Sequence, residues 1–183
     1  MTIPETITTE RLLLKLPQEC DAPQIAELAN NQQVSQNLGT MPFPYGLEDA
    51  LGWIKQQTEV HGSNGYNFAI FEKSNATFMG TISIFNLMNG APEYGFWLGE
   101  PFWGKGYVSE AALTLRDVVF ETLNAPFLLS KHMLDNPASG RIAEKCGLKE
   151  VERLPLWSRA RGKFSPGRTL KLERIDWERL KGL

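Results

Sequence analysis

The sequence has few of the residues that would indicate a metal centre or a secreted, disulfide-rich scaffold. Cysteine occurs twice, at Cys20 and Cys146, and histidine twice, at His61 and His132. Their positions show none of the spacings that structural zinc sites use. We therefore expect no metal site and reduced cysteines, with Cys146 packed as a small apolar residue in a cytoplasmic protein.

The chain also lacks long apolar runs and an excess of positive charge. No apolar segment is long enough for a bilayer, and no basic and apolar leader opens the sequence. The formal net charge of −2 is unlike the basic balance of nucleic-acid-binding proteins. We therefore expect neither a membrane nor a nucleic acid as a partner. The 183 residues, 42% of them hydrophobic, predict one soluble globular domain over 1–183, as a monomer or a homodimer.

A glycine-containing stretch, Phe102–Glu110, stands out between a predicted strand and a predicted helix. Its two glycines, Gly104 and Gly106, can adopt positive φ because they have no Cβ atom. A turn of this kind directs successive backbone N–H groups to one point, and a helix N-terminus there favours an anion. The stretch therefore indicates a phosphate-binding loop, although the same spacing fits a turn whose glycines serve geometry alone.

The pattern of apolar residues predicts an α+β chain built around one mixed sheet. The expected elements, in chain order, are a strand over 10–16, a helix over 21–29, a long loop over 30–46, a helix over 47–60, strands over 66–70, 78–87 and 93–98, a helix over 108–123, a strand over 127–134, a short helix over 136–146, and strands over 148–154 and 169–175. Gly147 is typical of the position just after a helix. A basic loop with Arg159, Arg161, Lys163 and Arg168 is expected within the last hairpin.

Taken in order, five motifs resemble the GNAT superfamily of acetyl-CoA-dependent N-acetyltransferases, and within it the ribosomal-protein N-terminal acetyltransferase (RimJ/RimL-like) branch. They are TERLLL from Thr9, EYGFWL from Glu93, WGKGYVSEA from Trp103, NPAS from Asn136 and EKCGL from Glu144. The resemblance covers nearly the whole chain. It implies a mixed, mostly antiparallel sheet of six or seven strands with about four helices, open between strands 93–98 and 127–134 to admit acetyl-CoA.

The resemblance also implies which residues bind the cofactor. The predicted contacts are Trp97, Leu98, Trp103, Gly104, Lys105, Gly106, Tyr107, Val108, Ser109, Asn136 and Ser139. Pro101 stands where the family has Gln or Arg, three residues before the first glycine. This departure removes a side chain but leaves the backbone N–H groups of the loop, so we expect phosphate binding to persist.

The catalytic residues predicted from the resemblance are Glu93 and Ser139. Glu93 resembles the strand carboxylate that deprotonates the amine through water, or it is simply the polar face of a half-exposed strand. Ala143 occupies the position of the family's usual tyrosine acid, which leaves the Ser139 hydroxyl, or water, to protonate the thiolate. Ser139 is equally suited to the first turn of a helix. Backbone N–H groups around Trp97 and Leu98 would stabilise the oxyanion.

Other residues remain alternatives for handling the amine or lining its pocket. Further bases or amine ligands are Asp135, Glu150, Glu152 and His132, and the acceptor is expected beside Pro42–Leu47, Trp53 and Trp157–Phe164. A basic last hairpin suits a neutral or acidic acceptor better than a polycation. The expected activity is direct acetyl transfer in a ternary complex to a primary amine, either a protein N-terminal α-amine or a small molecule. A detoxifying, antibiotic-type acetyltransferase and a degraded acyl-CoA-binding module are the alternatives.

Overall fold

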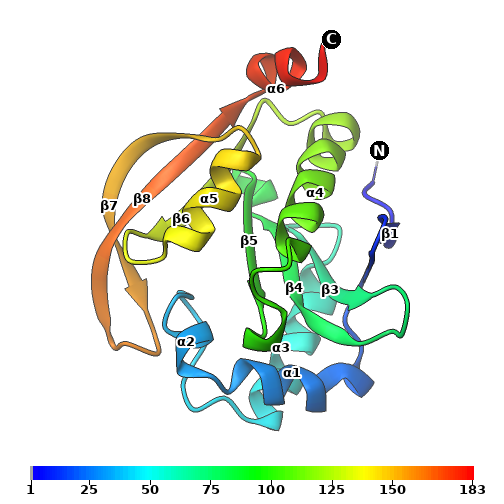
Figure 1. Ribbon diagram of the computed structural model, residues 1–183, viewed down its shortest axis with the longest axis vertical. Coiled ribbons are helices and arrows are strands. Elements are labelled where there is room, and N and C mark those ends of the chain that lie inside the picture. The colour runs from blue at the N-terminus through cyan, green and yellow to red at the C-terminus, as the bar shows by residue number, and fades with distance from the viewer. Residues whose placement is uncertain (1) are drawn as a thin grey trace.

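The computed structural model describes residues 2–183, which form one eight-stranded mixed sheet with helices on both faces (Figure 1). The strands are β1 (Thr6–Thr8), β2 (Leu12–Lys15), β3 (Tyr66–Glu72), β4 (Phe78–Phe85), β5 (Glu93–Leu98), β6 (Phe127–Met133), β7 (Lys149–Ser158) and β8 (Lys163–Glu173). The α-helices are α1 (Ala22–Ala29), α2 (Gln32–Ser35), α3 (Leu47–Val60), α4 (Tyr107–Leu123), α5 (Pro137–Lys145) and α6 (Arg174–Lys181). Three 3₁₀ turns, Glu19–Asp21, Leu87–Asn89 and Glu100–Phe102, complete the fold of this part of the chain.

The mixed α+β architecture is as expected, but it has more elements than the six or seven strands and about four helices of the prediction. Residues 2–183 contain eight strands and six α-helices. Strand β1 and the short helices α2 and α6 are the additions. Each is brief or strongly polar, and short elements give little periodic signal along the sequence. None of the helices in residues 2–183 is long and apolar enough to cross a membrane.

Two hydrophobic clusters hold the sheet, one on each face. Helix α4 buries Ala111, Leu115 and Val119 against one face of β2–β5, at the spacing of one helical stripe. Helices α1 and α3 pack Ile25 and Ile54 against the opposite face. Strands covered on both sides lose the alternation of apolar and polar residues, which explains the almost continuously buried β3.

The sheet opens at its centre. Its strand order is β1-β2-β3-β4-β5-β6-β8-β7, and β5 and β6 are the parallel pair. They pair only at Glu93 with Leu129 and at Tyr94 with Ser130. Beyond these residues the two strands separate, as the prediction for 93–98 and 127–134 requires. The long β7–β8 hairpin then curves away from β5 at the edge of the sheet (Figure 1).

Candidate active site

A cavity of about 780 Å³ lies where β5 and β6 separate. Its walls come from β5, the loop before α4, the first turn of α4, β6, α5, helix α2 with the residues after it, and the β7–β8 turn. The volume lies within the range of small-molecule and cofactor sites. Because the cavity passes between the two strands, a ligand inside it can reach the unpaired backbone of both.

Ten of the eleven predicted cofactor contacts line this cavity, and Lys105 does not. The ten are Trp97, Leu98, Trp103, Gly104, Gly106, Tyr107, Val108, Ser109, Asn136 and Ser139. The Nζ atom of Lys105 lies 5.9 Å from the centroid of the Phe102 ring. Any contribution of Lys105 to anion binding is therefore long-range attraction rather than a position in the wall.

The two glycines give the loop its shape. Gly104 and Gly106 have φ values of +75° and +81°, which residues with a side chain rarely adopt. The N-terminus of the 17-residue helix α4 follows directly. Within residues 2–183, no backbone N–H from Gly104 to Ser109 donates a hydrogen bond. Six consecutive unpartnered N–H groups at the positive end of a helix can bind a phosphate oxygen.

The two backbone N–H groups predicted to stabilise the oxyanion, those of Trp97 and Leu98, point to opposite sides of β5. The N–H of Gly99 donates to the Met79 carbonyl (2.9 Å), and the N–H of Leu129 donates to the Pro92 carbonyl (2.8 Å). Alternate residues of a strand direct their backbone groups to opposite neighbours. The N–H of Leu98 consequently faces the side from which β6 has moved away, whereas that of Trp97 faces β4. This geometry retains Leu98 for the oxyanion.

Helix α5 presents Asn136 and Ser139 to the cavity. Asn136 caps the helix, because its Oδ1 accepts a hydrogen bond from the Ser139 N–H (3.2 Å). The Ser139 hydroxyl has no partner among residues 2–183 and remains able to donate. Ala143, one turn further along, is fully buried in the core. The usual tyrosine position therefore supplies no polar group to this cavity.

Glu93 lies at the closed end of the opening and does not line the cavity. It is 7% exposed, and its Oε2 accepts a hydrogen bond from Lys131 Nζ at 2.8 Å. Lys131, by contrast, is part of the cavity wall. The alternative of a half-exposed polar strand face does not describe Glu93 either. The assignment of Glu93 as the base stays a prediction, and its carboxylate faces the lysine instead of the cavity.

Two of the alternative bases, His132 and Glu150, accept hydrogen bonds from arginine side chains. His132 Nε2 accepts a hydrogen bond from Arg168 Nε at 2.9 Å. Burial and the Arg168 charge lower the pKa of His132, so the imidazole is neutral at pH 7. Arg168 and Arg153 both donate to Glu150, which keeps the pKa of that carboxyl below its ordinary value. These contacts favour structural roles for His132 and Glu150.

Arg161, expected in a basic loop of the last hairpin, lines the cavity and joins the β7–β8 turn to Asp135 and to the residues after α2. Its five donor positions contact the Gln36 carbonyl, both carboxylate oxygens of Asp135, Asn37 Oδ1 and Ser165 Oγ. The hydrogen bond from Arg161 lowers the pKa of Asp135, which stays ionised. Arg161 is therefore occupied, and the last hairpin does not offer it as a free cation to an acceptor.

The lining of the cavity includes few of the residues predicted beside the acceptor. Of those segments only Arg161 lines it, whereas helix α2 and the residues after it contribute Gln33, Val34, Gln36 and Asn37. Trp53 packs against the cluster under α1 and α3. Sequence reasoning missed α2 because a helix of four residues is too short for a period to be visible.

The family model that matches this chain and the similar proteins described below are all acetyltransferases. Residues 11–149 match the model of the acetyltransferase (GNAT) domain family. The chain is 28% identical over 164 residues to the uncharacterized N-acetyltransferase p20 of Bacillus licheniformis, covering 87% of this chain and 91% of that protein. It resembles the microcin C7 self-immunity acetyltransferase MccE, solved with acetyl-CoA and AMP, at 21% identity, with a TM-score of 0.81 and coverage of 93% and 97%. It also resembles RimL, a ribosomal L7/L12 alpha-N-protein acetyltransferase solved with coenzyme A, at 19% identity, with a TM-score of 0.80 and coverage of 94% and 98%.

Proposed function

Because this chain belongs to the GNAT acetyltransferase family and so takes acetyl from acetyl-CoA, we propose that it acetylates a primary amine by direct transfer in a ternary complex. The observation that carries the proposal is the cavity at the separation of β5 and β6, with Gly104 and residues 106–109, whose N–H groups are unpartnered, in its wall. These groups bind the pyrophosphate of the cofactor. The pantetheine arm then runs between the separated strands towards Leu98.

Direct transfer is favoured by the state of the two cysteines. Cys20 is exposed and does not line the cavity. Cys146 is fully buried, and burial raises the pKa of its thiol to about 11. A buried thiol of this kind is not a nucleophile at neutral pH. Neither cysteine can therefore form an acetyl-enzyme intermediate, and the amine attacks the thioester of acetyl-CoA directly.

In the proposed reaction, three groups of this chain have separate roles. The Leu98 N–H donates to the oxyanion of the tetrahedral intermediate, where donors placed in advance contribute most. The Ser139 hydroxyl donates a proton to the departing thiolate while it takes one back from water, and Asn136 fixes the first turn of α5 beneath it. The cavity wall within residues 2–183 contains one carboxylate, Asp135, which Arg161 occupies. Water accepts the proton that the amine loses.

The charges of the wall favour a neutral or acidic acceptor. Lys131, Arg141, Lys145 and Arg161 line the cavity, and of these Lys131 and Arg161 each have a carboxylate partner. A polyamine or an aminoglycoside needs several free carboxylates, since each of its ammonium groups loses water on binding. Two kinds of acceptor need no such carboxylates, because they carry no cationic group besides the reacting amine. One is a protein N-terminus, the kind of substrate that the name of RimL states. The other is a small molecule with a single amine.

The test is acetyl transfer from acetyl-CoA, followed by thiol release and by the mass of the acceptor. The acceptors are peptides with small neutral N-terminal residues, the same peptides with a free lysine and a blocked N-terminus, a neutral amino sugar, spermidine and an aminoglycoside. We expect turnover on acceptors whose only cationic group is the reacting amine, and little turnover on spermidine and the aminoglycoside. Calorimetric binding of acetyl-CoA without turnover on any amine would contradict the proposal and favour an acyl-CoA-binding module.

A further inference from the structure

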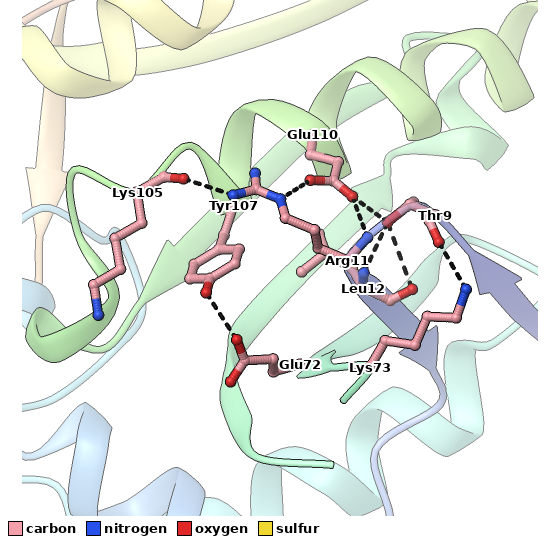
Figure 2. Close-up of polar contacts among 8 residues, drawn as sticks. All are labelled: Thr9, Arg11, Leu12, Glu72, Lys73, Lys105, Tyr107 and Glu110. Atoms are coloured by element: carbon pink, nitrogen blue, oxygen red, sulfur yellow. Dashed lines mark hydrogen bonds and ion pairs between the residues drawn. The ribbon is translucent and has the colours of Figure 1, made fainter. Parts of the chain in front are cut away.

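Arg11, just before β2, contacts the glycine loop and the first turn of α4 (Figure 2). Its Nη1 donates to the Lys105 carbonyl at 3.0 Å, and its Nε donates to Glu110 Oε2 at 2.7 Å. The Arg11 backbone N–H also donates to Glu110 Oε1 (2.9 Å). Arg11 itself does not line the cavity. One residue near the N-terminus thus holds both the loop and the first turn of α4.

The bond to the Lys105 carbonyl fixes the direction of one peptide group. In a trans peptide the C=O and the following N–H point in opposite directions. Because Arg11 holds the Lys105 carbonyl, the Gly106 N–H is directed away from Arg11. Gly106 lines the cavity, and its N–H has no partner in residues 2–183. Arg11 therefore selects the orientation in which this N–H can meet a ligand.

Arg11 also neutralises the negative charge of Glu110 in the first turn of α4. A carboxylate in the first turn of α4 suits the helix dipole, but it would repel an anion bound at the same helix end. Glu110 accepts hydrogen bonds from Thr9 Oγ1 (2.5 Å), from the Arg11 N–H and from the Arg11 guanidinium. Burial alone would raise the pKa of Glu110, but these bonds outweigh it and lower the pKa. The carboxylate stays charged, and the adjacent guanidinium cancels that charge.

The guanidinium is itself held in place. It lies over the Tyr107 ring, with 4.7 Å between its Cζ and the ring centroid. The Tyr107 hydroxyl donates to Glu72 Oε1 at 2.9 Å, at the end of β3. Figure 2 shows these side chains in one connected group between the sheet and the start of α4. The first residue of α4 is therefore tied to the sheet as well as to Arg11.

We propose that Arg11 is a positioning residue for the pyrophosphate of the cofactor: it orients the Gly106 N–H into the cavity and neutralises Glu110 beneath the first turn of α4. This inference rests on the proposed binding of pyrophosphate at residues 104–109. It assigns Arg11 no contact with the substrate.

The test separates pyrophosphate binding from the rest of the cofactor. Binding of CoA and dephospho-CoA, which both contain the pyrophosphate, is measured by calorimetry, and binding of pantetheine, which lacks it, by NMR titration. The Arg11→Met variant keeps the aliphatic contact with Tyr107 and loses the hydrogen bonds and the charge. We expect it to bind both nucleotides about tenfold or more weakly, the size of one lost charge-assisted hydrogen bond. Pantetheine binding should stay within about twofold of the unmodified protein.

Two further variants keep the proposal falsifiable if Arg11→Met also loses stability. Arg11→Lys retains the charge but not the geometry that joins Glu110 to the Lys105 carbonyl, and should bind CoA with intermediate affinity. Arg153→Met removes an arginine that is 69% exposed, pairs with Glu150 and lies outside the cavity, and should change nothing. In the NMR spectrum, the CoA-induced shift of the Gly106 amide should shrink in Arg11→Met.

Two results would overturn the inference. One is equal weakening of CoA and pantetheine by Arg11→Met, which indicates a general loss of structure. The other is unchanged CoA binding in that variant. Failure of the unmodified protein to bind CoA is a different result, because it contradicts the proposed function and not the role of Arg11 alone.

Discussion

The Glu93 carboxylate does not line the cavity and forms an ion pair with Lys131, which does. Its strand position matches that of the family's water-mediated base, yet the fold brings Lys131 to it from 38 residues away. A buried carboxylate paired with an ammonium contributes to folding only while both partners are present, since the remaining charge would be buried alone. Its environment therefore favours a structural role that holds Lys131 in the cavity wall.

The Glu93→Gln variant distinguishes this role from that of the base. A general base contributes about 10²–10⁴-fold to the rate, whereas we expect kcat/KM of this variant to fall by less than about tenfold. Stability should fall measurably, because Lys131 loses its partner. Steady-state kinetics at several pH values and urea unfolding measure the two effects. A hundredfold loss of kcat with removal of the acidic limb of the pH profile would restore Glu93 as the base.

Ser139 combines two roles that a single substitution separates. The cap of α5 uses the Asn136 side chain and the Ser139 backbone N–H, and leaves the Ser139 hydroxyl unused. Ser139→Ala should therefore keep the helix and its stability. We expect kcat to fall about 10²-fold if the hydroxyl protonates the thiolate, with little change in the KM for acetyl-CoA. Ser139→Thr, which restores a hydroxyl, serves as the control, and an unchanged kcat in Ser139→Ala would exclude the role.

At the scale of elements, helix α6 shows what the sequence pattern concealed. Residues 169–175 were predicted as a strand, but β8 ends at Glu173 and α6 begins at Arg174. Trp177 is the one buried residue of α6, 3% exposed, and its ring stacks on Phe120 of α4 at a centroid distance of 5.0 Å. Its Nε1 donates to Asp117 Oδ1 at 2.8 Å. A single aromatic anchor produces no stripe that a periodic pattern could reveal.

Removal of this anchor should release α6 from α4. Trp177→Ala leaves a cavity over Phe120 and removes one of the hydrogen bonds that Asp117 accepts, which still pairs with Arg116 and Lys181. We expect a loss of about 3–5 kcal/mol in the free energy of unfolding. Ile175→Ala on the same helix removes a side chain that is 54% exposed and should cost little. Urea unfolding of both variants measures the difference. Equal, small effects would show that α6 contributes nothing to the stability of the core.

The elements that the sequence predicted well are those whose signal is local. Helix α4 ends at Leu123 and β5 spans Glu93–Leu98, as expected from one apolar stripe and one alternating run. The short β1 and α2 were missed, because their formation depends on pairing and packing with distant segments.

The same distinction holds for the candidate site. The glycine loop was predictable, because positive φ is a local property of glycine. The partners of Glu93, Asp135 and Glu110 were not, since their arginines and lysine lie between 26 and 99 residues away. A sequence shows that charges are present, and only the fold shows which of them neutralise one another.

For the molecule as a whole, the opening that admits the cofactor also weakens the sheet. β5 and β6 share two residue pairs, so other contacts must join the parts of the chain before and after this point. The Arg11–Glu110 group joins the N-terminal strands to α4, and Arg161 with Ser158 joins the β7–β8 hairpin to the Gln36 carbonyl. These links cross the molecule without closing the space between the strands.

Because the Glu110 and Asp135 carboxylates in these links have lowered pKa values, acid should weaken the fold. A carboxyl group whose folded pKa lies below its unfolded value stabilises the protein fully above the unfolded value, here 4.5 for Glu110 and 3.8 for Asp135. That stabilisation is lost as the pH falls through the folded pKa, because the folded state must then take up protons against its hydrogen bonds.

Urea unfolding midpoints measured from neutral pH into this acidic range should therefore fall steeply below the ordinary pKa of glutamate. Glu110→Gln should be less stable than the unmodified protein at neutral pH, and its stability should fall less steeply with acid. The two curves then converge at low pH, where the unmodified Glu110 is itself protonated and no longer binds Arg11 as an anion. Parallel curves across the whole range would mean that Glu110 contributes no pH-dependent stability, and that the anchoring of α4 by Arg11 does not depend on its charge.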